Sequence, residues 1–179
     1  MPRPSLIGAC LLLLAPAAAA DGHVNLGPRM AKIEAGIYCS ENPENTQSAP
    51  DTEAGVISLY DEAPPFISDS PRVPAALGIG FGVRTLSKDS AGIDPVMMTV
   101  THPPFGGSGT TRQSYVTSIS GVGSSYSGYS FDVPEELAVG TWTFTATQGG
   151  EVLYTATFDV VPADLMPDVV EVCIGPPLS

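Results

Sequence analysis

The chain has 179 residues, with 19 acidic and 7 basic side chains and a formal net charge of −12 at pH 7. Binding to nucleic acid needs clustered Lys and Arg that release counterions from phosphates, so this charge argues against a nucleic-acid partner. The length fits one domain, and 18 prolines argue against a mainly helical fold.

The first twenty residues have the pattern of an export signal. Arg3 supplies a positive start, residues 6–14 form an apolar run, and residues 18–20 are small alanines before a cleavage site. The apolar run is shorter than the roughly 20 residues that a membrane span needs. We therefore expect a periplasmic or secreted protein that begins at Asp21, has no membrane span and carries a net charge of −13, because cleavage removes only one base.

Cleavage after residue 20 would also create a metal-binding pattern at the new amino terminus. The terminal amine of Asp21, the backbone amides of Gly22 and His23 and the imidazole of His23 can surround Cu(II) or Ni(II) in a square plane. The pattern spans only three residues, and cleavage one residue away would destroy it. A chance occurrence is therefore the alternative to copper or nickel binding.

Short segments with β-type alternation recur along the chain, separated by Gly, Pro, Ser, Asp and Asn. We predict strands at residues 31–39, 55–60, 77–86, 96–101, 113–119, 129–133, 141–147, 152–160 and 169–173. Residues 40–51 are predicted to form a loop, and residues 132–137 a single helical turn. The pattern favours an all-β, immunoglobulin-like sandwich of two antiparallel sheets with seven to nine strands, and one domain over residues 21–179.

The hairpin at residues 140–161 has the clearest pattern. Its first strand places Trp142, Phe144 and Ala146 on one face and threonines on the other. A two-residue turn would put the apolar set of the return strand on the opposite face, so we predict a three-residue loop, 148–150. This loop pairs Trp142, Phe144 and Ala146 with Ala156, Tyr154 and Val152.

Two cysteines, Cys39 and Cys173, remain after cleavage and fall in the first and last predicted strands. An oxidising compartment favours a disulfide between them. Such a bond closes a loop of more than a hundred residues, and the chain-entropy model gives it about 5 kcal/mol of stability. Two reduced, buried cysteines are the alternative.

Several motifs together resemble a known family. They are LGIGFGV at residues 77–83, THPPF at 101–105, TRQSY at 111–115, GYSFD at 128–132, Glu136-Leu137 and the hairpin at 140–161. The combination resembles a family of exported bacterial domains of unknown function, over about residues 33–161. The resemblance implies an exported immunoglobulin-like domain and no known activity.

The best candidate for a contact surface is the rigid turn His102-Pro103-Pro104, with Phe105, the following glycines and Arg112. In the alternative, His102 only caps a strand end and Arg112 pairs with a surface carboxylate. A Ser-His-Asp hydrolase would depend entirely on His102, and the sequence has no Gly-x-Ser-x-Gly elbow.

The main functional hypothesis is a monomeric, non-enzymatic, exported sandwich without a cofactor. It would bind an envelope protein or a small envelope ligand through its loops or an edge strand. An apolar pocket with convergent polar groups would count against it. The alternatives are a copper- or nickel-binding protein that uses residues 21–23 and a hydrolase built on His102 and Arg112.

We expect Cu(II) to bind the exported protein tightly in a one-to-one complex if its intact mass shows that it begins at Asp21, because all four nitrogen ligands are then present. Titration of the parent and of a His23→Ala variant with Cu(II) measures this. Equal affinity of the two proteins would contradict the prediction.

Overall fold

The structure is a computed structural model and describes residues 23–175. The larger sheet has the strand order β1, β11, β10, β7, β8, and β5 lies beside the second half of β11. Its strands are β1 (Val24–Leu26), β5 (Arg72–Ala75), β7 (Ile93–Thr101), β8 (Arg112–Ile119), β10 (Gly140–Gln148) and β11 (Glu151–Pro162). The smaller sheet has the order β2 (Met30–Cys39), β6 (Ile79–Ser87), β9 (Ser125–Ser130), and β3 (Asn45–Ser48) with β4 (Val56–Leu59) forms a separate hairpin.

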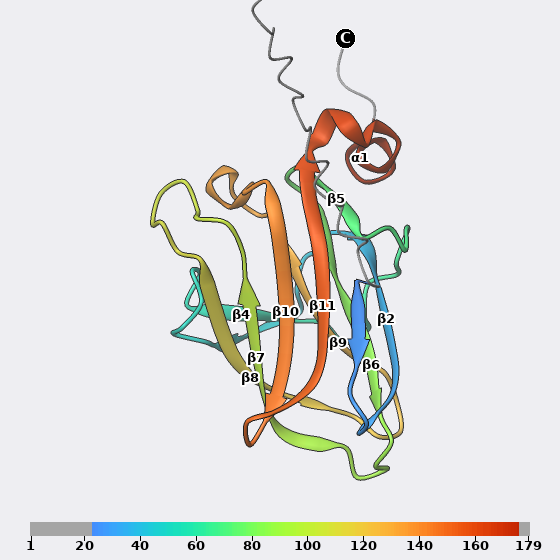
Figure 1. The fold of residues 1–179 in the computed structure, drawn as a ribbon. Helices are drawn as coiled ribbons and strands as arrows, with labels where there is room; N and C mark the ends of the chain where they lie inside the picture. The colour runs from blue at the N-terminus through green and yellow to red at the C-terminus, as the bar shows by residue number, and fades with distance from the viewer. Residues whose placement is uncertain (1–22, 176–179) are drawn as a thin grey trace, which may run out of the picture.

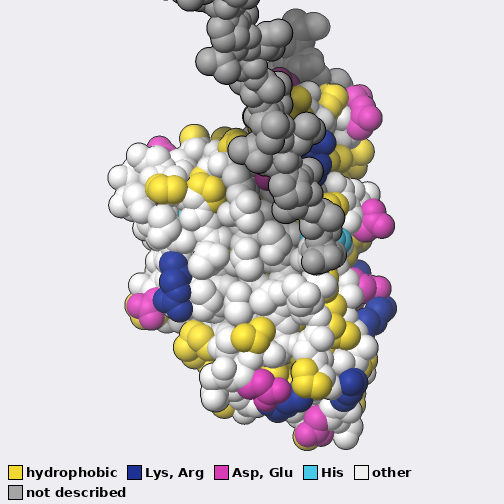
Figure 2. All heavy atoms as spheres, in the orientation of Figure 1, with side chains coloured by type: hydrophobic (Ala, Val, Ile, Leu, Met, Phe, Trp, Pro, Cys, Tyr) yellow, Lys and Arg dark blue, Asp and Glu magenta, His cyan; other side chains and the backbone are white. Residues whose placement is uncertain are grey.

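The two sheets pack face to face, which confirms the all-β, immunoglobulin-like sandwich (Figure 1). Alternate residues of the central strands enter the core, among them Ile79, Phe81 and Val83 in β6 and, as the sequence predicted, Trp142 in β10. The outer face of β10 and β11 carries threonines instead, and Figure 2 shows few charged side chains on the visible part of this face.

The predicted loop of the β10–β11 hairpin is wrong. The turn has two residues, Gly149 and Gly150, both with positive φ, and Gln148 pairs with Glu151. The faces still match because β11 has a β-bulge: Ala146 pairs with Tyr154, whereas Thr147 pairs with Val152. Leu153 is the extra residue, and it shifts the alternation by one position, so that Trp142 pairs with Phe158.

The predicted strand at residues 169–173 is also wrong. This segment is the helix α1 (Pro167–Ile174), which follows the short turn η2 (Ala163–Leu165). Pro167 fits the first turn of a helix, where its missing N–H has no helical partner anyway. Met166, Val169 and Cys173 pack against the core, and their spacing places them on one helical face.

The chain has eleven described strands, more than the seven to nine predicted, because β1, β3 and β5 were missed. Residues 45–48, expected in a loop, form β3. The sandwich is not wholly antiparallel, since β5 runs parallel to β11. These strands have only three or four residues, too few for a recognisable alternation. The predicted helical turn at 132–137 is confirmed as η1 (Pro134–Glu136).

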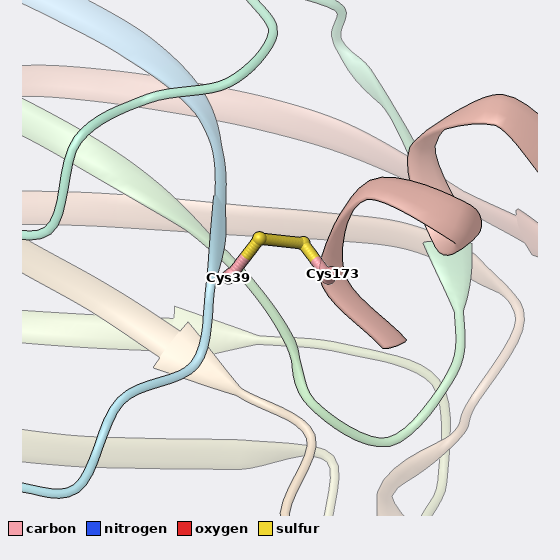
Figure 3. Close-up of a disulfide and its surroundings, with 2 residues drawn as sticks. All are labelled: Cys39 and Cys173. Carbon is pink, nitrogen blue, oxygen red and sulfur yellow. A yellow bond between two sulfur atoms is a disulfide. The ribbon is translucent and has the colours of Figure 1, made fainter. Parts of the chain in front are cut away.

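Cys39 and Cys173 form the predicted disulfide, with their Cα atoms 5.1 Å apart. It joins β2 to α1 and therefore holds a helix, not a final strand, against the smaller sheet (Figure 3). Helix α1 lies at the end of the sandwich opposite the β10–β11 turn (Figure 1). Within residues 23–175, no helix has the length and apolar character needed to cross a membrane.

We expect a Cys39→Ser/Cys173→Ser protein to lose about 2–5 kcal/mol of unfolding free energy, because the bond restricts a large loop in the unfolded chain. Urea unfolding of both proteins measures the loss. Reduction of the parent should lower its midpoint to that of the variant and leave the variant unchanged. Equal midpoints of the oxidised parent and the variant would contradict the prediction.

Candidate ligand pocket between the edge strands

A pocket lies where the two sheets end. Strand β8 is an edge of the larger sheet and β9 is an edge of the smaller one. Between them is a pocket of about 270 Å³, lined by residues of both strands and by residues 52–60. The β3–β4 hairpin therefore covers the open side of the sandwich. It lies behind β7 and β8 in Figure 1.

Hydrogen bonds hold the segment between β3 and β4 against β8 and the loop that precedes it. The backbone N–H of Ser114 donates to the carbonyl of Asp51 at 3.0 Å. The backbone N–H of Glu53 donates to Oε1 of Gln113 at 2.8 Å, and Oγ1 of Thr110 donates to the Glu53 carboxylate at 2.7 Å. The segment that links β3 to β4 is thus docked on the larger sheet, which gives the pocket a defined wall.

The other side of the pocket consists of tyrosines on the outer face of the smaller sheet. Tyr38 lies across β6, and its hydroxyl is 3.0 Å from Oγ of Ser130. Tyr126 packs edge to face against Tyr38 and also against Tyr60, with ring centroids 5.5 and 6.3 Å apart. The three rings therefore form one continuous aromatic surface.

Glycines in the smaller sheet make room for these rings. A Cβ on Gly80 would lie 2.2 Å from the Tyr38 ring, and a Cβ on Gly128 would lie 2.1 Å from the Tyr126 hydroxyl. A larger residue at either position would displace a pocket tyrosine. The motifs LGIGFGV and GYSFD, which contain these glycines, are thus directly involved in forming the pocket wall.

The Tyr126 hydroxyl lies near that of Tyr38 but is buried without a hydrogen-bond partner in the described chain. A buried hydroxyl without a partner costs about 1–3 kcal/mol. Burial raises the pKa of Tyr126 well above its ordinary value and raises that of Tyr115, on β8, to about 12. Both hydroxyls therefore stay protonated at neutral pH.

Two carboxylates lie at one end of the pocket. Glu136 accepts hydrogen bonds from the Tyr129 hydroxyl at 2.8 Å and from the backbone N–H groups of Asp132 and Val133 at 2.9 and 3.3 Å. Both of its oxygens are thus used within the turn. Burial and, to a smaller extent, the charge of Glu136 raise the pKa of Asp132.

His102, the centre of the predicted contact surface, belongs to the core. Only 6% of its surface is exposed, and its ring stacks between Phe105 and Trp142 at centroid distances of 4.0 and 4.5 Å. Nδ1 lies 2.8 Å from the Pro103 carbonyl and Nε2 lies 3.2 Å from Nε2 of Gln113. Because a carbonyl only accepts, Nδ1 carries the proton and Nε2 accepts, as in a neutral imidazole.

Of the other residues of the predicted surface, Pro103 and Phe105 contact His102, whereas Pro104 and Arg112 do not join a common site with it. Phe105 is buried, whereas Pro104 is exposed. Arg112 is also exposed and donates to Oγ1 of Thr99 at 3.3 Å, on the outer face of the larger sheet. The structure therefore does not bring His102 and Arg112 together in one site, and it gives a hydrolase on this pair no geometric support.

Asp21 and Gly22 of the predicted metal site lie outside the described residues. The carbonyl of His23 accepts a hydrogen bond from the backbone N–H of Thr157 at 2.6 Å, and its ring lies 6.3 Å from that of Phe158. No group of three or more His, Cys, Asp or Glu side chains suited to a metal occurs among residues 23–175. Copper or nickel binding at the amino terminus stays a prediction.

Reasoning from sequence missed the pocket because its five tyrosines come from four separate segments. Tyr38 lies on β2, Tyr60 follows β4, and Tyr115 lies on β8, while Tyr126 and Tyr129 lie on β9. The spacing of Tyr126 and Tyr129 puts them on opposite faces of one strand. The one signal available was the run of glycines that alternates with apolar residues in β6.

Burial lowers the pKa of His102, despite an opposing effect of its bond to Pro103. The unfolded chain takes up a proton at this position below about pH 6.5, whereas the folded chain resists it, so stability should fall as the pH is lowered. We expect His102→Gln to reduce this decrease and His23→Gln to retain it, in urea unfolding between about pH 5.5 and 7.5. An equally steep decrease in His102→Gln would contradict the assignment.

The family described as "Domain of unknown function (DUF3859)" matches residues 27–160, close to the limits expected from the motifs. Among solved structures, the chain is similar to an immunoglobulin-like protein from Pseudomonas aeruginosa, with 21% identity and a TM-score of 0.48 over 80% of this chain and 100% of that chain. No curated protein sequence matches it significantly. Since the family match covers most of the chain, the protein belongs to the DUF3859 family.

Proposed function

We propose that this chain is an exported, non-catalytic binding domain that holds a small molecule in the pocket between β8 and β9. The observation that carries the proposal is the pocket itself, about 270 Å³, with the unpartnered hydroxyl of Tyr126 in its lining. The pocket is partly open to solvent, which gives a small molecule a route of entry.

The size and lining of the pocket suit a small ligand. Ligand pockets commonly have volumes of about 300–1,000 Å³, and this one, at about 270 Å³, is slightly smaller. Tyrosine offers a large apolar ring and a polar hydroxyl with few rotatable bonds, which favours binding at a low entropic cost. These features support the small-ligand alternative of the sequence hypothesis, with a proposed site between the edge strands instead of on the loop at 102–112.

A pocket with convergent polar groups was expected to count against a non-catalytic domain, and one is present, so the chemistry of its lining decides between binding and catalysis. Among the described residues, its lining contains no Cys, His or Lys that could serve as a nucleophile or base. Glu136 already accepts three hydrogen bonds, and His102 lies outside the lining with both ring nitrogens used. These groups support binding more than chemistry.

Export is part of the proposal and is supported indirectly. The predicted signal at residues 1–20 lies outside the described residues. The disulfide between Cys39 and Cys173 fits an oxidising compartment such as the periplasm or the extracellular space.

The proposal is tested by filling the pocket. Thr117 faces the pocket from β8, and Ser118 is its exposed neighbour on the opposite face of the strand. Molecules from a chemically diverse set that raise the melting temperature of the parent should do so in Ser118→Trp and lose the effect in Thr117→Trp. Ligands that stabilise all three proteins equally, or no stabilising ligand at all, would contradict a small-molecule pocket.

A further inference from the structure

The charge of the pocket lining points to the class of ligand. Apart from tyrosines, its ionisable side chains are Asp132 and Glu136, and no Lys, Arg or His of the described chain lines it. The described ion pairs, Arg29 with Glu151 and Lys32 with Glu34, involve neither carboxylate. The pocket therefore holds negative charge that no side chain of the described protein neutralises.

The two carboxylates differ in their capacity to interact with a ligand. Glu136 is buried, and its charge is stabilised by the Tyr129 hydroxyl and by two backbone N–H groups. Asp132 is an exposed residue of the pocket lining and has no such partner for its side chain in the described chain; partial burial and the charge of Glu136 raise its pKa. A cation next to Asp132 would relieve this unfavourable environment, whereas an anion would make it worse.

The aromatic surface also favours a positively charged ligand. Tyr60 and Tyr126 meet edge to face, as do Tyr126 and Tyr38, so the rings present faces in different directions. Such faces attract cations, with a gain of about 0.5–2 kcal/mol for each contact, more when water is excluded.

We propose that the pocket binds a small organic cation, with Asp132 as its counter-charge and the rings of Tyr60 and Tyr126 as its cation–π partners. This inference rests on the proposed function, that the pocket binds a small molecule. An anionic ligand is disfavoured because the lining offers it no positive charge. The net negative charge of the chain would also increase the local concentration of cations near the protein.

The test compares two probes of equal shape by isothermal titration of the exported, disulfide-bonded protein. One is choline, a quaternary ammonium ion, and the other is its neutral isostere, in which a carbon atom replaces the nitrogen. We expect choline to bind roughly tenfold more tightly than the isostere. Equal affinities, or no binding of choline, would overturn the cation proposal.

Asp132→Asn removes the charge and keeps the shape of the side chain, and Asp164→Asn is the matched control on the exposed turn η2. Asp132→Asn should weaken choline binding about fivefold or more and leave the isostere unchanged, while Asp164→Asn should change neither. Unchanged choline binding in Asp132→Asn would contradict the role of this carboxylate. If choline does not bind but a neutral compound stabilises the parent and loses this effect in Thr117→Trp, the proposed small-molecule pocket stands and the cation proposal is wrong.

Discussion

The contacts of one ring, Phe81, hold the two sheets together. Phe81 lies in the middle strand of the smaller sheet and packs against Trp142, Phe144 and Phe158 of the larger sheet at centroid distances of 5.4, 5.8 and 5.1 Å. Its fully buried side chain lies at the centre of the aromatic core. Because these contacts set the spacing and orientation of the sheets, the relative positions of the edge strands β8 and β9 depend on them.

The alternation of β6 gives the smaller sheet two different faces. Its inner face carries Ile79, Phe81 and Val83, whereas its outer face carries Gly80 and Gly82. The flat outer face lets Tyr38 and Tyr126 lie close to the backbone, and the segment after β4 then packs over them. One strand thus positions both the hydrophobic core and the aromatic wall of the pocket.

The pocket exists because the smaller sheet ends at β9 without a strand to join it to β8. An exposed edge strand offers unpaired backbone groups and is commonly covered. Here the cover is a hairpin docked on β8 by Gln113, Ser114 and Thr110, and it leaves a space instead of closing the sandwich. Tyrosine hydroxyls and two carboxylates line this space, so its negative charge follows from the composition of a few loops.

The amino-acid sequence by itself determined the fold class, most strand positions, the Cys39–Cys173 pairing and the core role of Trp142, because period-two alternation and glycine and proline boundaries are local signals. It did not determine the bulge at Leu153, the helix that carries Cys173, the strands β1 and β5, which pair with the distant β11, or the short strand β3, which has too few residues for a clear alternation. Only the tertiary structure brought Tyr38, Tyr60 and Tyr126 together and placed His102 between two core rings. The physical reason is that a pocket depends on which strands are left unpaired at the edges of two packed sheets, and long-range packing decides this.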